Sequence, residues 1–206
     1  WGGIEMLLST NPFACAIPGL EEPPIVLDMA TTVASYGKVK MAALHGGQMP
    51  EGWMIDADGR PTTNPEDFKT GSAVPIAAHK GYGLTLVMEI LSGVLTGAMF
   101  GADHNWRDKP EGPAAITDVG HFFLAIDPAM FMPIEDFKAR METLIGHLKA
   151  SKLAPGVERI IVPGEPEYEA RARNLASGTI PLLRTTYESV AAHIEKWDLG
   201  IELPPA

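Results

Sequence analysis

Three short segments combine polar side chains with glycines at points where a strand or a loop passes into a helix. The segments are Asp28-Met29-Ala30-Thr31-Thr32, His79-Lys80-Gly81-Tyr82-Gly83-Leu84 and Val162-Pro163-Gly164-Glu165-Pro166-Glu167. In α/β proteins, ligands usually bind where strands end beside helices. These three segments are therefore the first candidates for a binding site.

Asp28 follows the short apolar run 25–27 and precedes a helical pattern, so we place it as a helix N-cap at the end of a strand. A carboxylate in that position can accept hydrogen bonds from ribose hydroxyls, while first-turn amides and threonine hydroxyls can hold a phosphate. A plain N-cap explains the same residue, and the pattern alone favours that simpler interpretation.

Lys80 lies between His79 and Gly81 immediately before a long apolar stretch. Gly81 and Gly83 would let a backbone approach a ligand closely, and the lysine offers a mobile positive charge for a phosphate or a 2'-phosphate. A loop with a solvated lysine fits equally well. The residues by themselves leave both interpretations open.

Gly164 and Glu165 follow a predicted short strand and open a predicted helix, where they could touch a ribose or a base. Acidic residues at a helix N-terminus are also favourable in themselves, and by pattern alone this simpler explanation is preferred.

Other chemical signatures are absent. The sequence has no G-x-G-x-x-G, so a standard Rossmann half is disfavoured, and its six histidines show no metal-ligand spacing, so we expect no metal site. Glu89 is alone in an apolar helical stretch, and we expect it to pair with a buried Arg or Lys.

The periodicity of apolar residues predicts alternating strands and helices in one domain, hence an α/β or mixed three-layer arrangement. Gly93, Gly97 and Gly101 form a stripe that we attribute to close approach by another backbone. The expected elements are two strands within 5–18 separated by a turn at 9–12, a strand at 25–27, a long irregular surface loop at 46–78, a buried helix at 84–100, a buried strand at 120–126, an amphipathic helix at 133–149, a strand at 157–162, and helices at 165–176 and 187–197.

Composition excludes some classes of function. Sixteen Lys and Arg against 26 Asp and Glu give a net charge of -10, which argues against nucleic acid as a partner. No apolar run is long enough for a membrane span, so no membrane association is expected. The single cysteine, Cys15, allows no intrachain disulfide and makes the cytoplasm the expected location.

Taken together, these segments resemble the type-2 malate/L-lactate dehydrogenase family, which includes ureidoglycolate, sulfolactate and diketogulonate dehydrogenases and piperideine-carboxylate reductase. The resemblance extends almost from end to end of the chain. It rests on Ser9-Thr10-Asn11-Pro12, Asp28-Met29-Ala30-Thr31, Ser35-Tyr36-Gly37-Lys38, Pro50-Glu51-Gly52-Trp53, Pro61-Thr62-Thr63-Asn64-Pro65, His79-Lys80-Gly81-Tyr82-Gly83-Leu84, Glu89-Ile90-Leu91 and Pro163-Gly164-Glu165.

The resemblance implies a non-Rossmann, sulfolactate-dehydrogenase-like α/β fold, with a mixed three-layer sheet and helices on both faces, that binds NAD or NADP. It also implies a homodimer that acts on a small 2-hydroxy acid, a 2-keto acid or a cyclic imino acid. The cofactor-binding residues that it implies are Pro24, Ile25, Val26, Leu27, Asp28, Met29, Ala30, Lys80, Gly81, Pro163, Gly164 and Glu165.

The family's catalytic histidine lies in an N-terminal Ser-His-Gly segment that has no counterpart among these 206 residues. We therefore expect a C-terminal portion of the family's protein, a single cofactor-binding domain with C-terminal helices over 1–206, and no catalytic residue in this chain. The alternative is a non-catalytic nucleotide-binding or subunit-interaction protein.

Overall fold

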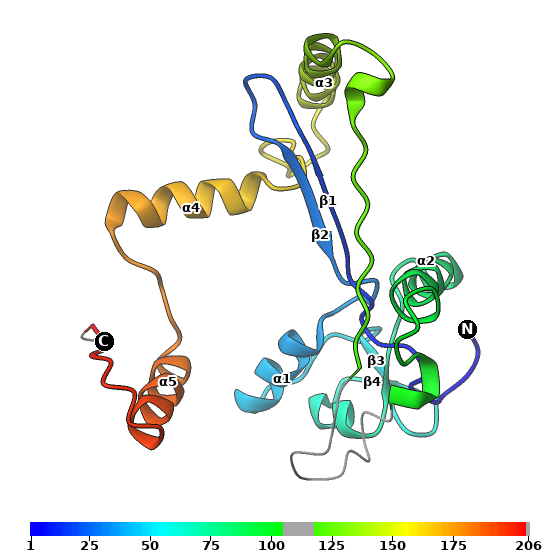
Figure 1. The fold of residues 1–206 in the computed structure, drawn as a ribbon. Helices are drawn as coiled ribbons and strands as arrows, with labels where there is room; N and C mark the ends of the chain where they lie inside the picture. Colours follow the sequence, from blue (N-terminus) through cyan, green and yellow to red (C-terminus); the bar gives the residue numbers. More distant parts are fainter. Residues whose placement is uncertain (105–117, 205–206) are drawn as a thin grey trace. The chain divides into compact units, whose positions relative to one another are not determined.

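The structure, a computed structural model, describes residues 1–104 and 118–204. The chain divides into two compact units, Trp1–Lys152 and Leu153–Ala206. Within the described residues, the first unit contains helices and short strands and the second contains helices without strands (Figure 1). Whether the two units form the single domain expected from the sequence stays a prediction.

The first unit is built around an antiparallel hairpin of β1 (Phe13–Ile17) and β2 (Ile25–Met29), in which Phe13 pairs with Met29 and Ile17 with Ile25 (Figure 1). Residues of β1 alternate between half-buried and exposed, as expected of a strand with one packed face. The predicted strands at 13–17 and 25–27 are therefore confirmed. No strand forms at 6–8, where a preceding one was expected.

The segment 46–78 contributes to the core and is not the surface loop predicted from its turn residues. It forms a small antiparallel sheet of β3 (Met54–Ile55), β4 (Pro61–Thr62) and β5 (Ser72–Ala73), in the order β4-β3-β5, and the short helix η1 (Pro65–Lys69). Met54 is fully buried and packs with Ala34, Val39 and Met49. The turn prediction was correct locally, but apolar residues between the turns bring this segment into the core.

Helix α1 (Tyr36–Leu44) begins at Ser35, whose hydroxyl accepts a hydrogen bond from the backbone N–H of Lys38. The prediction of Asp28 as a helix N-cap is therefore wrong. Asp28 lies inside β2, paired with Ala14, and Thr32 beyond the strand forms an isolated β-bridge with Pro75. The phosphate-binding role that we attached to first-turn amides at Asp28 has no helix to supply it.

Helix α2 (His79–Glu89) continues directly into the π-helix η2 (Ile90–Val94). The expected helix at 84–100 is thus confirmed up to residue 94, but its burial is not. Its apolar side chains are largely exposed in the described structure: Leu86, Val87, Ile90, Val94 and Leu95.

The three glycines of the predicted stripe have different roles. A Cβ on Gly93 would lie 3.1 Å from the carbonyl oxygen of Met99, so close backbone approach is confirmed there. Gly97 and Gly101 have φ of +76° and +55° and open space around them. They are needed for turns, since a left-handed backbone favours glycine.

Residues 120–126, expected as a buried strand, form no strand, and Phe123 is 89% exposed. The described chain continues through η4 (Pro128–Met130) into the long helix α3 (Ile134–Lys149), which confirms the amphipathic helix predicted at 133–149. Ile145 is the buried residue of its apolar face. A short helix, η3 (Gly101–His104), precedes the residues that are not described.

The second unit contains α4 (Glu165–Ser177) and α5 (Arg184–Lys196), close to the predicted bounds of both helices. Gly164 and Gly178 flank α4 with φ of +97° and +68°. The strand predicted at 157–162 does not form. Instead, Arg159 forms a salt bridge with Glu169 that joins this extended segment to α4.

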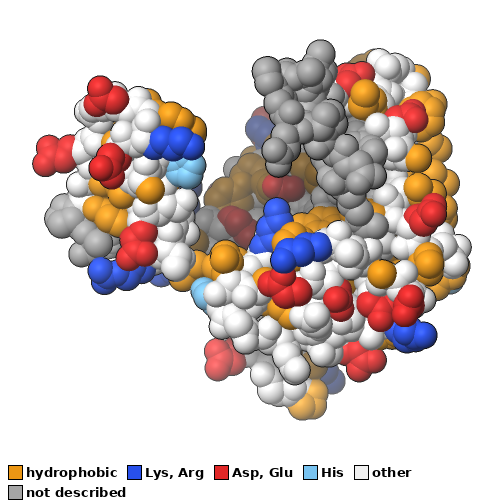
Figure 2. All heavy atoms as spheres, turned by 90° about the horizontal axis from the view of Figure 1, so that it is seen from below, with side chains coloured by type: hydrophobic (Ala, Val, Ile, Leu, Met, Phe, Trp, Pro, Cys, Tyr) orange, Lys and Arg blue, Asp and Glu red, His pale blue; other side chains and the backbone are white. Residues whose placement is uncertain are grey.

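In the described part of the chain, no helix has both the length and the apolar character needed to cross a membrane. Figure 2 shows acidic side chains scattered over the visible face rather than gathered in one patch, and fewer basic ones. This distribution agrees with the net charge of -10. It offers no broad basic surface on that face for a polyanion.

Candidate cofactor-binding site

The first candidate segment lies along β2 and just beyond it. Ile25 to Met29 form the strand, in which only Asp28 is exposed, while Pro24 precedes it and Ala30 follows it. The carboxylate of Asp28 therefore faces outward at the end of a strand. It remains available to a hydroxyl-bearing ligand.

Immediately after this segment, Thr31 is completely buried and holds the end of β2 in place. Its backbone N–H donates to the carbonyl oxygen of Thr10 at 2.8 Å, and its hydroxyl donates to the same oxygen at 3.0 Å. Its own carbonyl oxygen accepts from the N–H of Ile76 at 3.0 Å. Thr31 thus connects the hairpin to the residues that lead into α2.

The second candidate segment forms the first turn of α2, and not a loop before it. Lys80 is exposed, and no ion pair of its ammonium group is seen among the described residues. Gly81 is buried, and a Cβ there would lie 1.7 Å from the carbonyl oxygen of Ile76, whereas Gly83 faces open space. Gly81 is therefore required by the protein's own backbone, and this contact does not depend on a ligand.

The backbone that leads into α2 is strained. Ala77 and Ala78 have φ of +46° and +55°, and Ala78 combines its positive φ with ψ of -127°. Residues other than glycine rarely adopt such conformations, and the conformations that do occur are often found at functional sites. The strain lies directly before His79, whose ring stacks edge-on with Trp1 at 6.5 Å between centroids.

Glu89 pairs differently from our expectation of a buried Arg or Lys. Its carboxylate accepts a hydrogen bond from the side-chain amide of Asn11 at 2.5 Å and another from the backbone N–H of Gly101 at 2.7 Å. Asn11 itself has φ of +30° and accepts from the N–H of Ser9. Two neutral donors therefore take the place of a cation in the described structure. Asn11 connects the segment 9–12 to α2, and Gly101 connects the start of η3 to it.

Sequence reasoning missed Thr85, which occupies a buried position in α2. Its hydroxyl lies 2.9 Å from the hydroxyl of Thr31 and 2.8 Å from the carbonyl oxygen of Gly81. The available signal was a hydroxyl among apolar neighbours, in a helix where Ala or Leu would be the more favourable residue. Contacts of Thr31 and Thr85 bring the two candidate segments of the first unit together.

The third candidate segment lies in the second unit, at the start of α4. Gly164 is buried with φ of +97°, and Glu165 closes the turn because its carboxylate accepts from the N–H of Val162 at 3.0 Å. Pro163 is exposed beside it. The predicted turn before a helix is confirmed, with Gly164 in the left-handed conformation that glycine adopts readily. A ligand contact of these three residues stays a prediction.

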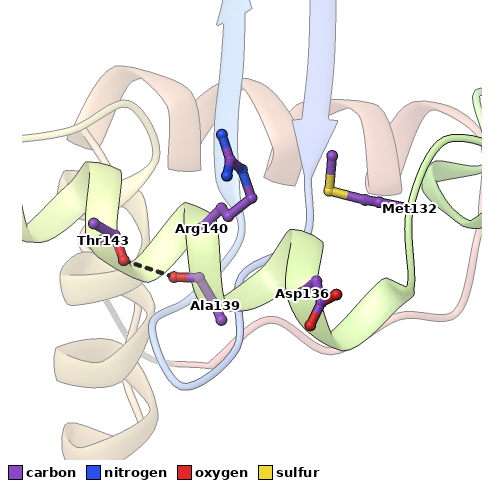
Figure 3. A pocket seen from close by; sticks show the side chains of 5 residues that line it. All are labelled: Met132, Asp136, Ala139, Arg140 and Thr143. Carbon is purple, nitrogen blue, oxygen red and sulfur yellow. Dashed lines mark hydrogen bonds between the residues drawn. The ribbon is translucent and has the colours of Figure 1, made fainter.

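A hollow of about 450 Å³ lies on one side of α3 (Figure 3). Met132, Asp136, Ala139, Arg140 and Thr143 line it. The hydroxyl of Thr143 donates to the carbonyl oxygen of Ala139 within the same helix. No predicted binding residue lines this hollow, and it contributes nothing to the candidate site.

No cluster of three or more potential metal ligands occurs within residues 1–104 and 118–204. His45 caps the end of α1, and His193 stacks on Trp197 in α5. Among the histidines, the side chain of His104 lies outside the described residues. The geometry therefore supports binding residues and identifies no catalytic histidine among those described.

Known proteins resemble the chain over nearly its whole length. The sequence profile of the malate/L-lactate dehydrogenase family matches residues 1–191. Malate dehydrogenase from Pyrococcus horikoshii is 37% identical over 92% of this chain and 53% of its own length. Ureidoglycolate dehydrogenase (NAD(+)) from Escherichia coli K12 is 33% identical over 91% of this chain and 52% of its own.

Solved structures agree with these sequence matches. Sulfolactate dehydrogenase from Methanocaldococcus jannaschii superposes with a TM-score of 0.78 at 34% identity, covering 95% of this chain and 55% of that one. Malate dehydrogenase from Pyrococcus horikoshii gives 0.79 at 33% identity, over 98% and 54%. The sulfolactate-dehydrogenase-like fold is confirmed, and the chain spans about half the length of the relatives it matches. This chain belongs to the malate/L-lactate dehydrogenase family.

Proposed function

We propose that this chain supplies the cofactor-binding residues of an NAD- or NADP-dependent oxidoreductase. The observation that carries the proposal is the junction of β2 and α2. Two family motifs about fifty residues apart, at Asp28 and Lys80, are tied together through Thr31, Ile76, Gly81 and Thr85. Relatives named for NAD(+) and for NADP(+) support a nicotinamide cofactor.

The residues that would hold the cofactor are those of 24–30, Lys80, Gly81 and 163–165. The exposed carboxylate of Asp28 can accept from ribose hydroxyls, and the exposed ammonium group of Lys80 can neutralise a phosphate. Gly164 and Glu165 are proposed to contact a ribose or base. A bound nicotinamide would supply hydride transfer.

We assign no proton donor to the chain. Reduction of a carbonyl or imine also needs a proton, which the family's Ser-His-Gly histidine is expected to provide from outside these 206 residues. Binding of cofactor without turnover is the behaviour expected of this chain alone. A non-catalytic nucleotide-binding role remains the alternative.

The proposed substrates are small 2-hydroxy acids, their 2-keto counterparts or cyclic imino acids. The names of the relatives support this range, since they include malate and sulfolactate dehydrogenases and a pyrroline- and piperideine-carboxylate reductase. A homodimer is a further proposal that follows from the family resemblance. A single cofactor-binding domain is proposed from the sequence pattern, and a cytoplasmic location from the single cysteine.

Fluorescence titration with NADH and NADPH tests the cofactor site. Lys80→Ala should weaken binding about tenfold, which corresponds to about 1.4 kcal/mol for one lost charged contact. Lys38→Ala is the matched control, because Lys38 is also an exposed lysine in the first turn of a helix of the same unit. Equal affinity of the two variants and the unmodified chain would refute the site.

A further inference from the structure

We propose that Thr85 is a positioning residue, which sets the end of β2 against the first turn of α2 and so places the two cofactor-binding segments relative to each other. The proposal rests on the proposed function. It concerns a residue that touches no cofactor in that scheme and acts through Thr31 and Gly81.

A closed circuit of contacts supports this role. The Ile76 N–H donates to the carbonyl oxygen of Thr31, and the Ile76 carbonyl oxygen lies against Gly81. The single hydroxyl proton of Thr85 is shared between two acceptors, the carbonyl oxygen of Gly81 at 2.8 Å and the hydroxyl oxygen of Thr31 at 2.9 Å. Each of the four residues therefore contacts the next, and the circuit joins positions 54 residues apart in the chain.

Two residues of this circuit are neighbours in the sequence of proposed cofactor-binding residues. Thr31 directly follows Ala30, the last residue of the first segment, and Gly81 follows Lys80 in the second. Gly81 and Thr85 are four residues apart, about one helical turn of roughly 6 Å along the axis. A shift of Thr85 relative to Thr31 therefore moves Lys80 relative to Asp28.

Because Thr85 is buried, the hydrogen bonds of its hydroxyl cannot be replaced by bonds to water. Thr31 is completely buried and Thr85 is 3% exposed, so water does not replace a lost partner there. The hydroxyl of Thr31 donates to the carbonyl oxygen of Thr10 and accepts from Thr85. A valine at 85 would preserve shape and remove the donor, whereas a serine would preserve the donor.

Two substitutions at one position and one control test the proposal by NADH fluorescence titration. Thr85→Val should raise the Kd at least fivefold, and Thr85→Ser should stay within twofold of the unmodified chain. The control is Thr143→Val. The Thr143 hydroxyl also donates to a carbonyl oxygen of its own helix, that of Ala139, and no hydrogen bond from it to another segment is among the described contacts. It should leave the Kd unchanged.

Coupling to Lys80 separates positioning from general destabilisation. In a Lys80→Ala background, Thr85→Val should cost less than twofold, because the group that it positions is gone. A full fivefold loss in that background, or a Thr85→Val variant that binds like the unmodified chain, would overturn the proposal. So would a Thr85→Ser variant as weak as Thr85→Val.

Hydrogen exchange provides a readout that needs no cofactor. Thr85→Val should accelerate exchange of the Thr31 and Ile76 amides, and Thr85→Ser should not. If the unmodified chain binds no NADH, the proposed function fails, and the exchange data still decide whether Thr85 holds the two segments. Unchanged exchange in Thr85→Val would reject the positioning role even if cofactor binds.

Discussion

Gly81 lies so close to Ile76 that a Cβ on Gly81 would be 1.7 Å from the Ile76 carbonyl oxygen. No side chain larger than hydrogen fits without moving the backbone. The contact holds the first turn of α2 against the segment that bonds to Thr31.

Gly81→Ala should therefore lower the free energy of unfolding by about 2 kcal/mol or more, as expected when a backbone contact must shift. The matched control is Gly83→Ala, two residues further along the same helix with open space around it. It should raise stability by up to about 1 kcal/mol, because alanine is the better helix former. Urea denaturation measures both, and equal effects would contradict the close approach at Gly81.

Ala78→Gly should stabilise the protein by about 1 kcal/mol, because glycine adopts the observed combination of φ +55° and ψ -127° without the cost to an L-residue. Ala139→Gly, at an exposed position within α3, should instead cost about 1 kcal/mol. Thermal unfolding of the two variants checks the opposite signs. A destabilised Ala78→Gly variant would show that the strain is not real.

Glu142 of α3 should hold the loop between β1 and β2 in a pH-dependent way. Its Oε1 accepts from the backbone N–H groups of Leu20, Glu21 and Glu22 at 3.1, 2.9 and 2.9 Å. These bonds, that of Glu22 first, hold the pKa of the Glu142 carboxyl below its ordinary value of 4.5, and the charge of Lys149 acts in the same direction.

Because the folded-state pKa is lowered, the stabilisation is present above pH 4.5 and is lost as pH falls through the folded-state value. Glu142→Gln should therefore remove part of the loss of melting temperature between pH 6 and pH 3. The control is Glu135→Gln, whose carboxylate faces Lys138 on the same helix. If both variants keep the pH profile of the unmodified protein, Glu142 does not hold this loop.

Asn11→Asp should destabilise the protein by about 1 kcal/mol at pH 7, because it replaces a donor with a second carboxylate beside Glu89. Protonation of the introduced carboxylate removes the repulsion, so this penalty should shrink at acidic pH. Asn11→Ala separates the lost hydrogen bond from the repulsion. A pH-independent difference between the Asp and Ala variants would argue against contact with Glu89.

The sequence by itself determined the family and the local elements whose signals are short-range. Helices α3, α4 and α5 and the strand β2 lie within a few residues of their predicted bounds. Amphipathic periodicity, turn residues and flanking glycines act over one or two helical turns, so each can be recognised from neighbouring residues alone. The candidate binding motifs were found in the same way.

Tertiary structure alone decided where Asp28 lies and what Glu89, Gly81 and Thr85 contact. Asp28 had the pattern of an N-cap, but it pairs with Ala14 inside β2, and the next helix begins only after Ser35. Buried polar groups must find partners, and which partner is in reach depends on segments far away in the chain. A hydroxyl at position 85 meets one at position 31 only after the hairpin and α2 have packed together, which no local pattern encodes.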